Sequence, residues 1–192
     1  MKNLAWVNGQ VCELNKARIP LEDRGFFFGD GVYEVIRIYN GKLFYPVAHL
    51  KRLEKSARAI KIDMPKGLTE IETIGRDLIS DSGCQEGYLY FQVTRGCAKR
   101  DHLFPKETAP GMVAYVREMP PLRSIEAVQP LKCITLPDER WLNCHIKTVN
   151  LLPNLLARQK ADDMGAAEAI LYRSEEIVTE GSRSNVFAVV EG

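Results

Sequence analysis

The sequence predicts an α+β fold, and three observations lead to this class. Asn-Gly pairs at positions 8–9 and 40–41 each separate short apolar runs, a pattern typical of antiparallel hairpins with type I′ turns. Residues 46–62 and 69–83 carry apolar side chains at helical spacing. Residues 88–95 are rich in aromatic and β-branched side chains, which favours a strand. Hairpins and helices in one chain indicate an α+β architecture.

A boundary between two parts is expected near residue 120. Met119-Pro120-Pro121 is the most linker-like stretch of the chain, because prolines neither continue a helix nor pair in a central strand. The sequence therefore predicts an N-terminal α+β domain at 1–119 and the first part of a second domain at 120–192.

Composition restricts the function classes. The 192 residues are 45% hydrophobic and 27% charged, with a net charge of +1, which is ordinary for a soluble globular protein and gives no broad electrostatic footprint for nucleic acid or anionic membrane. No run approaches the length of a transmembrane helix, and the N-terminus has no signal-peptide pattern. The five cysteines are scattered, so we expect no metal site, no disulfide framework and a cytoplasmic location.

The elements of the first part follow from local patterns. We expect, in order, a hairpin at 4–12, a phenylalanine-rich core turn at 19–31, a strand at 31–39 with its return at 42–45, a helix at 46–62, a capped helix from 69 to about 83, and strands at 88–95 and 111–118. In the strand at 31–39, Tyr33 and Glu34 fall on opposite faces. Both faces carry polar groups, so alternation alone does not say which one is buried.

The second part should begin with a strand at 131–136 and continue into a buried helix. Asn150 is a fair N-cap for this helix, and Gly165 is a plausible stop. The leucines and methionine at helical spacing are Leu151, Leu152, Leu155, Leu156 and Met164. A strand ending near Val178, a polar turn at 181–184 and another apolar strand at 185–190 complete the chain.

Lys147 is the first candidate for chemistry, because it lies just before this helix. A desolvated lysine loses proton affinity, and its neutral amine can form a Schiff base with an aldehyde. The alternative is that its stem packs and its ammonium group reaches water.

Five other side chains are candidate site residues, and each has a structural interpretation. Glu180 is a carboxylate at the mouth of a strand–loop–strand element, or a solvated turn residue. Arg100 and His102 lie two residues apart in a loop, where they suit a carboxylate ligand or form a charged surface. Tyr33 is either a packed aromatic or a hydroxyl aimed into a site, and Arg52 belongs by periodicity to a solvated basic face.

Two motifs together resemble the class IV aminotransferase family. Residues 146–150 read IKTVN, and residues 178–185 read VTEGSRSN, in the family's order and spacing. The stretches at 23–34, DRGFFFGDGVYE, and at 49–53, HLKRL, resemble further family segments. The resemblance covers essentially the whole chain. It implies a two-domain fold-type IV structure, with an N-terminal α/β sandwich and the start of a C-terminal α/β pseudo-barrel.

The resemblance also implies a cofactor, pyridoxal 5′-phosphate, and roles for individual residues. Lys147 would hold the cofactor and act as the general base, Glu180 would pair with the pyridine nitrogen, and Arg52 would bind the phosphate. Tyr33 would help to bind the substrate carboxylate, together with Arg100 and His102.

The Arg100-x-His102 pair resembles the D-amino-acid branch of the family. It implies transamination between D-alanine and 2-oxoglutarate, giving pyruvate and D-glutamate, in a homodimer whose partner subunit supplies the pair. The other partners would be small-molecule substrates, namely amino acids and 2-oxo acids, with no nucleic acid and no membrane. A branched-chain aminotransferase, an aminodeoxychorismate lyase and a non-catalytic truncated module stay open as alternatives. Family members continue past residue 192, so we expect that the phosphate-binding cup lies outside this sequence.

Overall fold

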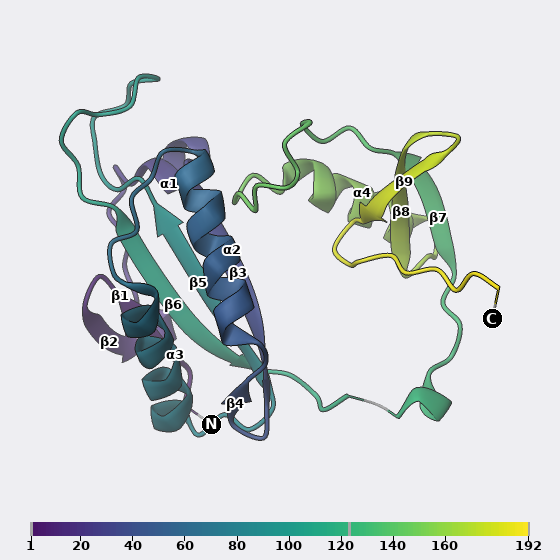
Figure 1. The fold of residues 1–192 in the computed structure, drawn as a ribbon, viewed down its shortest axis with the longest axis horizontal. Helices are drawn as coiled ribbons and strands as arrows, with labels where there is room; N and C mark the ends of the chain where they lie inside the picture. The colour runs from purple at the N-terminus through teal and green to yellow at the C-terminus, as the bar shows by residue number, and fades with distance from the viewer. Residues whose placement is uncertain (1, 123, 192) are drawn as a thin grey trace. The chain divides into compact units, whose positions relative to one another are not determined.

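The computed structural model describes residues 2–122 and 124–191, and the chain divides into two compact units. The first unit consists of Met1–Leu122 and His145–Val149, and the second of Arg123–Cys144 and Asn150–Gly192 (Figure 1). A short segment around Lys147 thus belongs to the first unit although it lies far along the chain. The domain ranges 1–119 and 120–192 remain a prediction, and each unit is described here by itself.

The first unit is built on an antiparallel sheet of six strands in the order β2-β1-β6-β5-β3-β4. The strands are β1 (Leu4–Val7), β2 (Gln10–Glu13), β3 (Gly31–Tyr39), β4 (Lys42–Leu43), β5 (Gly87–Thr94) and β6 (Gly111–Glu118). Both predicted Asn-Gly turns are confirmed, because Asn8, Gly9, Asn40 and Gly41 all have positive φ angles, which type I′ turns require.

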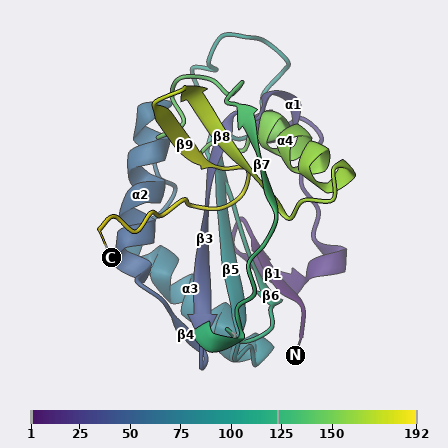
Figure 2. The ribbon, with the colours of Figure 1, turned by 90° about the vertical axis from the view of Figure 1, so that its right-hand side faces the viewer.

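Two helices cover one face of this sheet. They are α2 (Pro46–Ala59) and α3 (Leu68–Ser82), and α2 runs beside β3 in both views (Figures 1 and 2). A short helix, η1 (Leu14–Lys16), follows β2. The side-chain cap expected for the helix from residue 69 is wrong, because α3 starts at Leu68 and has Gly67 as its N-cap without a side-chain bond. The expected stop is confirmed at Gly83, which adopts φ 73°.

The hydrophobic core between the helices and the sheet shows which face of β3 is buried, a question that the alternation of residues alone did not answer. It contains Val32, Ile36, Ile38, Leu50, Leu53, Ile71, Leu78, Leu89 and Phe91. Glu34 lies on this same buried face of β3, with 0% exposure. The opposite face of the strand carries Tyr33 and Arg37 and is partly open. A carboxylate is therefore enclosed in an apolar core, which requires charged or hydrogen-bonding partners.

The predicted phenylalanine core at 26–28 is wrong. These residues form a one-turn helix, α1 (Arg24–Phe28), which Asp23 caps by accepting a hydrogen bond from the Gly25 amide at 2.8 Å. Phe26 is 71% exposed, and the other two rings are half-buried. A short helix points three consecutive side chains in different directions, so they cannot all face the core.

The second unit has a sheet of three strands in the order β7-β8-β9 and one longer helix. β7 (Cys133–Pro137) pairs in parallel with β8 (Glu168–Ser174), which pairs antiparallel with β9 (Ile177–Gly181). α4 (Leu152–Asp163) connects the parallel strands, and η2 (Ile125–Ala127) precedes β7. The buried core is small and consists of Ala161, Ala166, Ala169 and Leu171.

Two expectations for the second unit are wrong. α4 is not the buried leucine-faced helix, because Ala157 and Ala161 turn toward the sheet while Leu152, Leu155 and Leu156 are each more than 60% exposed. Its N-cap is Leu151 rather than Asn150, with no side-chain cap. Residues 185–190 form no strand, since the chain turns after β9 and finds no partner strand in the part that the structure describes.

No helix within the described residues is long and apolar enough to span a membrane. The same residues contain no group of three or more histidine, cysteine or acidic side chains suited to a metal ion.

Candidate active site

Lys147 is held against the start of β3 by backbone hydrogen bonds on both sides. The Tyr33 amide donates to the Lys147 carbonyl at 3.0 Å, and the Val149 amide donates to the Gly31 carbonyl at 3.1 Å. The Lys147 amide in turn donates to Ser56 Oγ on α2 at 3.2 Å. Residues 147–149 therefore extend the sheet like a short extra strand, which fixes where the lysine side chain begins.

The Lys147 amine contacts the Tyr33 side chain. Lys147 Nζ lies 3.3 Å from the Tyr33 hydroxyl and 4.4 Å from the centroid of the ring. Tyr33 itself stacks on Tyr90 of β5, with centroids 5.6 Å apart. Within the described residues, the amine makes no ion pair with a carboxylate. The structure thus brings two predicted site residues together and leaves the amine without a fixed counter-charge.

Arg52 is tied to the buried carboxylate of Glu34. Its Nε donates to Glu34 Oε1, and its Nη2 donates to Oε2 at 2.9 Å. The His49 Nδ1 lies 2.8 Å from the same Oε2. Burial raises the pKa of Glu34, but the hydrogen bonds from Arg52 and His49 outweigh it and hold the pKa below its ordinary value. Glu34 in return raises the pKa of Arg52.

This pairing changes how Arg52 is understood. Arg52 lies on an exposed face of α2, as its periodicity predicts, with a side chain 52% exposed, and the bidentate pair with Glu34 in addition fixes its guanidinium. Its Nη1 makes no hydrogen bond within the described part of the chain. Sequence reasoning missed Glu34 and His49 as site residues. The sequence did contain a signal for Glu34, because this carboxylate lies on the same face of the strand as Val32 and Ile36.

Arg100 and His102 gather on one aromatic ring. The Arg100 guanidinium carbon lies 5.1 Å from the centroid of Phe28, and the His102 ring centroid lies 5.5 Å from the same point. Both side chains are exposed. The loop therefore presents one permanent cation and one imidazole side by side, an arrangement suited to a carboxylate.

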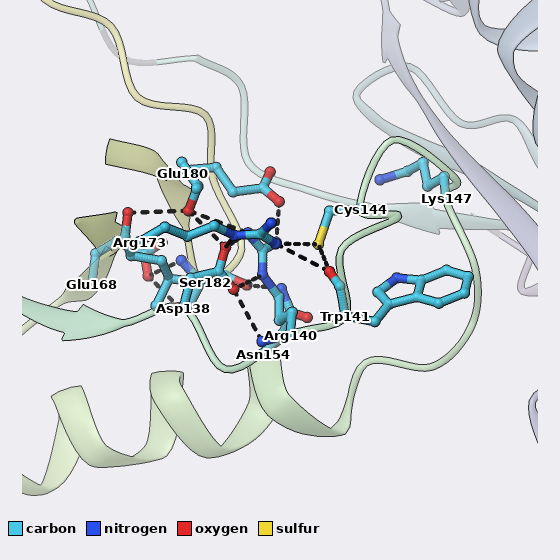
Figure 3. A network of polar contacts seen from close by, with 12 residues as sticks. Asp138, Arg140, Trp141, Cys144, Lys147, Asn154, Glu168, Arg173, Glu180 and Ser182 are labelled. Carbon is cyan, nitrogen blue, oxygen red and sulfur yellow. Dashed lines mark hydrogen bonds and ion pairs between the residues drawn. The ribbon is translucent and has the colours of Figure 1, made fainter. Parts of the chain in front are cut away.

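Glu180 lies on β9 in the second unit, where it faces Arg140 (Figure 3). The Arg140 Nη1 donates to Glu180 Oε1, while its Nε and Nη2 grip the two oxygens of Asp138, each at 2.8 Å. Thr179 Oγ1 donates to Asp138 Oδ2 at 2.9 Å. The Arg140 bonds hold the pKa of Asp138 well below its usual range, despite burial. An ionised Asp138 thus anchors the arginine that orients Glu180.

The turn that follows Glu180 is fixed by a second carboxylate. Glu168 Oε1 accepts hydrogen bonds from the Ser182 amide at 3.1 Å and from the Ser182 hydroxyl, and its Oε2 accepts from Ser184 Oγ at 2.8 Å. Asn154 Nδ2 on α4 donates to the Ser182 carbonyl at 2.8 Å (Figure 3). Neither Glu168 nor Asp138 was singled out from the sequence, because each lies outside the recognisable motifs.

Comparison with known proteins matches this arrangement to a family. The pattern described as amino-transferase class IV covers residues 31–192. A D-alanine aminotransferase from Staphylococcus haemolyticus is 41% identical over 189 residues, which make up 97% of this chain and 66% of that protein. A D-alanine aminotransferase from Bacillus licheniformis is 44% identical over 182 residues, which make up 94% of this chain and 63% of that protein. The chain thus spans about two thirds of the length of these relatives.

Solved structures agree on the fold. The branched-chain amino acid aminotransferase of Escherichia coli superposes with a TM-score of 0.81 at 19% identity over 95% of this chain and 63% of that chain. The T.th. branched-chain amino acid aminotransferase, solved with pyridoxamine 5′-phosphate, gives a TM-score of 0.83 at 23% identity, with the same coverage. At identities of 19% and 23%, the similarity shows only that the fold is shared. This fold is the fold-type IV architecture that the sequence predicted. The chain therefore belongs to the class IV aminotransferases.

Proposed function

We propose that the protein transaminates D-amino acids with pyridoxal 5′-phosphate, moving an amino group between D-alanine and 2-oxoglutarate to give pyruvate and D-glutamate. The observation that carries this proposal is the Lys147 amine beside the Tyr33 hydroxyl, at 3.3 Å, in a segment fixed to β3. The names of the relatives at 41–44% identity support the substrate class.

The side chains present fit the cofactor. Lys147 offers an amine without a carboxylate partner among the described residues, which suits covalent attachment of an aldehyde. Arg52 has an uncommitted Nη1 for a phosphate, and Glu180 has one carboxylate oxygen that Arg140 does not engage. When bound, the cofactor supplies an electron sink that stabilises negative charge on the substrate α-carbon.

The proposed roles follow from the contacts of each residue. Lys147 would hold the cofactor, and its amine would act as the base that moves the proton of the substrate α-carbon. Glu180 would pair with the protonated pyridine nitrogen of the cofactor, and Arg140 keeps the Glu180 carboxylate oriented. The Arg52 guanidinium, fixed by Glu34, neutralises the phosphate.

The substrate carboxylate is assigned to the side chains of Tyr33, Arg100 and His102. An arginine fork gives both energy and orientation to a desolvated carboxylate, and this fixes which side of the α-carbon faces the base. A homodimer in which the partner subunit supplies the loop belongs to the same proposal, as does a cytoplasmic location.

Substrate profiling of the complete, cofactor-loaded protein tests this function. We expect D-alanine and 2-oxoglutarate to be converted into pyruvate and D-glutamate, and Lys147→Ala to abolish the reaction. Lys160→Ala, on the exposed side of α4, is the matched control and should stay active. Robust turnover of L-leucine without turnover of D-alanine would instead support a branched-chain aminotransferase.

A further inference from the structure

A buried ionic cluster lies beneath the loop that carries Arg100 and His102. Asp30 Oδ2 accepts hydrogen bonds from Arg24 Nε and Arg95 Nε, each at 2.8 Å, and Asp30 Oδ1 accepts from Arg95 Nη2 at 2.9 Å. The three side chains are only 3–10% exposed. The proposed reaction uses none of them, so this cluster needs another explanation.

The cluster contains two guanidinium groups and one carboxylate, so its charges do not balance. A buried charge without a counter-charge needs other polar or polarisable partners. Arg95 donates to the carbonyls of Ile60 and Lys61, at 2.7 and 2.9 Å. Arg24 Nη1 donates to the Asp101 carbonyl at 2.7 Å, and this carbonyl lies between Arg100 and His102.

Aromatic rings supply the remaining partners. The Arg95 guanidinium carbon lies 3.6 Å from the centroid of Phe104, and that of Arg24 lies 4.8 Å from the centroid of Phe28. Phe28 is also the ring on which Arg100 and His102 gather. The cluster thus grips the loop at the Asp101 carbonyl and at Phe104, on both sides of His102.

The loop has little else to hold it there. Residues 99–104 are all exposed, so no apolar core of their own fixes their conformation. Near its start, the loop is bonded through the Gly96 carbonyl, which accepts from the Arg24 amide at 2.9 Å, and through the Ala98 amide, which donates to the Glu22 carbonyl at 3.2 Å. Within the loop, Thr108 Oγ1 donates to the Cys97 carbonyl at 3.0 Å, and the Leu103 amide donates to Asp101 Oδ1 at 2.9 Å. Apart from these bonds, the geometry of Arg100 and His102 on the exposed loop depends on the rigid residues that contact the loop.

We infer that Arg24, Asp30 and Arg95 are positioning residues that set the conformation of the loop bearing Arg100 and His102. The inference rests on the proposed function for its catalytic consequence, whereas the anchoring itself is a property of the first unit. A loop held in its binding conformation before substrate arrives loses less entropy on binding. Weakening the anchor should therefore raise KM for the carboxylate substrate more than it lowers kcat.

Amide hydrogen exchange of the complete protein without substrate tests the anchoring. Arg24→Lys keeps the charge but loses the planar fork, and it should speed exchange across residues 97–110 by about tenfold or more, since a charged hydrogen bond is lost. Arg37→Lys is the matched control: Arg37 also donates to a carbonyl, that of Pro120, and lies over the Tyr39 ring, but it does not touch the loop. Should Arg24→Lys fail to fold, Phe104→Leu tests the same anchor, because it alters only an exposed ring.

Steady-state kinetics on the same variants separates the anchor from the proposed function. We expect Arg24→Lys or Phe104→Leu to raise KM for D-alanine about tenfold and to have little further effect when Arg100 is already alanine. The inference would be overturned by an unchanged rate of amide hydrogen exchange in the loop. It would also be overturned if the variants lowered kcat/KM equally in the wild-type and the Arg100→Ala proteins. If Arg100→Ala itself leaves the use of D-alanine unchanged, the role proposed for Arg100 fails, and the exchange result alone decides the anchor.

Discussion

Lys147 and Tyr33 are joined twice in the first unit. The Tyr33 amide donates to the Lys147 carbonyl at 3.0 Å, and the Lys147 amine lies 3.3 Å from the Tyr33 hydroxyl. The backbone bond sets the position of both residues, and the side-chain contact joins the proposed base to a group proposed to bind substrate. Residues that are 114 positions apart thus form one local site.

Tyr33→Phe keeps the stacked ring and removes only the hydroxyl. We expect KM for D-alanine to rise severalfold, because a neutral hydrogen bond contributes about 0.5–1.5 kcal/mol. Steady-state kinetics measures this change, and Tyr39→Phe, on the same face of β3, is the control. A KM equal to that of the wild type would remove Tyr33 from the carboxylate site.

Glu34→Gln should weaken the grip on the cofactor. The substitution removes the charge that fixes Arg52. Removing one partner of a buried ion pair costs about 3–5 kcal/mol of folding stability. Because Arg52 is half exposed, we expect a smaller loss of stability, about 2–3 kcal/mol. Chemical denaturation and cofactor titration measure the two effects. Glu72→Gln, which removes an exposed helix pair with Arg76, is the control and should cost far less.

The same variant predicts a pH dependence of stability. The folded-state pKa of Glu34 is lowered below 4.5, so its contribution is fully present above that pH and is lost as pH falls through the folded pKa. The difference in unfolding free energy between wild type and Glu34→Gln should therefore be constant near neutrality and shrink as the pH falls below 4.5 and through the lowered pKa of folded Glu34. A difference that grows on acidification would contradict the ionised state assigned to Glu34.

Glu180→Gln should slow removal of the substrate α-proton far more than it weakens substrate binding. Loss of a charge partner for the pyridinium costs a few kcal/mol, or roughly two to three decades in rate. Single-turnover absorbance measures this step, and Glu176→Gln in the turn between β8 and β9 is the control. An unchanged single-turnover rate would refute the role.

Mixed dimers test whether the loop serves the neighbouring subunit. Arg100→Ala should lower kcat/KM for D-alanine ten- to a hundredfold or somewhat more, since a charge-assisted bond contributes about 1.5–3 kcal/mol. Mixing Arg100→Ala subunits with Lys147→Ala subunits should restore activity, because one site then has its own lysine and the partner's arginine. Verified heterodimers without complementation would show that the loop serves its own subunit.

Local patterns predicted the first unit well, for physical reasons. The Asn-Gly turns, the strand at 31–39 and the two helices depend on short-range geometry that the residues carry themselves. The second unit was predicted less well, because α4 buries alanines and exposes its leucines, which hydrophobic periodicity cannot anticipate. The strand predicted at 185–190 failed for a related reason, since a strand needs a partner and not only a β-prone sequence.

The candidate site was predicted only in part. Sequence motifs indicate residues proposed to face a ligand, but they do not indicate the other residues that hold those side chains in position. Glu34, Asp138 and Glu168 are carboxylates with partners on other elements of their own units, namely Arg52, Thr179 and Ser182. Their importance comes from burial and pairing, and neither property is visible along the chain. Arg24 and Asp30 lie in the stretch at 23–34 that resembles the family, yet their bond to each other and the bond from Arg24 to the loop appear only in three dimensions.

The central claim is that Lys147 carries the cofactor, and reductive trapping tests it most directly. The complete protein is loaded with pyridoxal 5′-phosphate, reduced with borohydride, digested and analysed by mass spectrometry. We predict that the reduced pyridoxyl group is attached to the peptide containing Lys147 and is absent from the Lys147→Ala protein. Attachment to a different lysine, or an unmodified Lys147 in protein shown to hold the cofactor, would contradict the account.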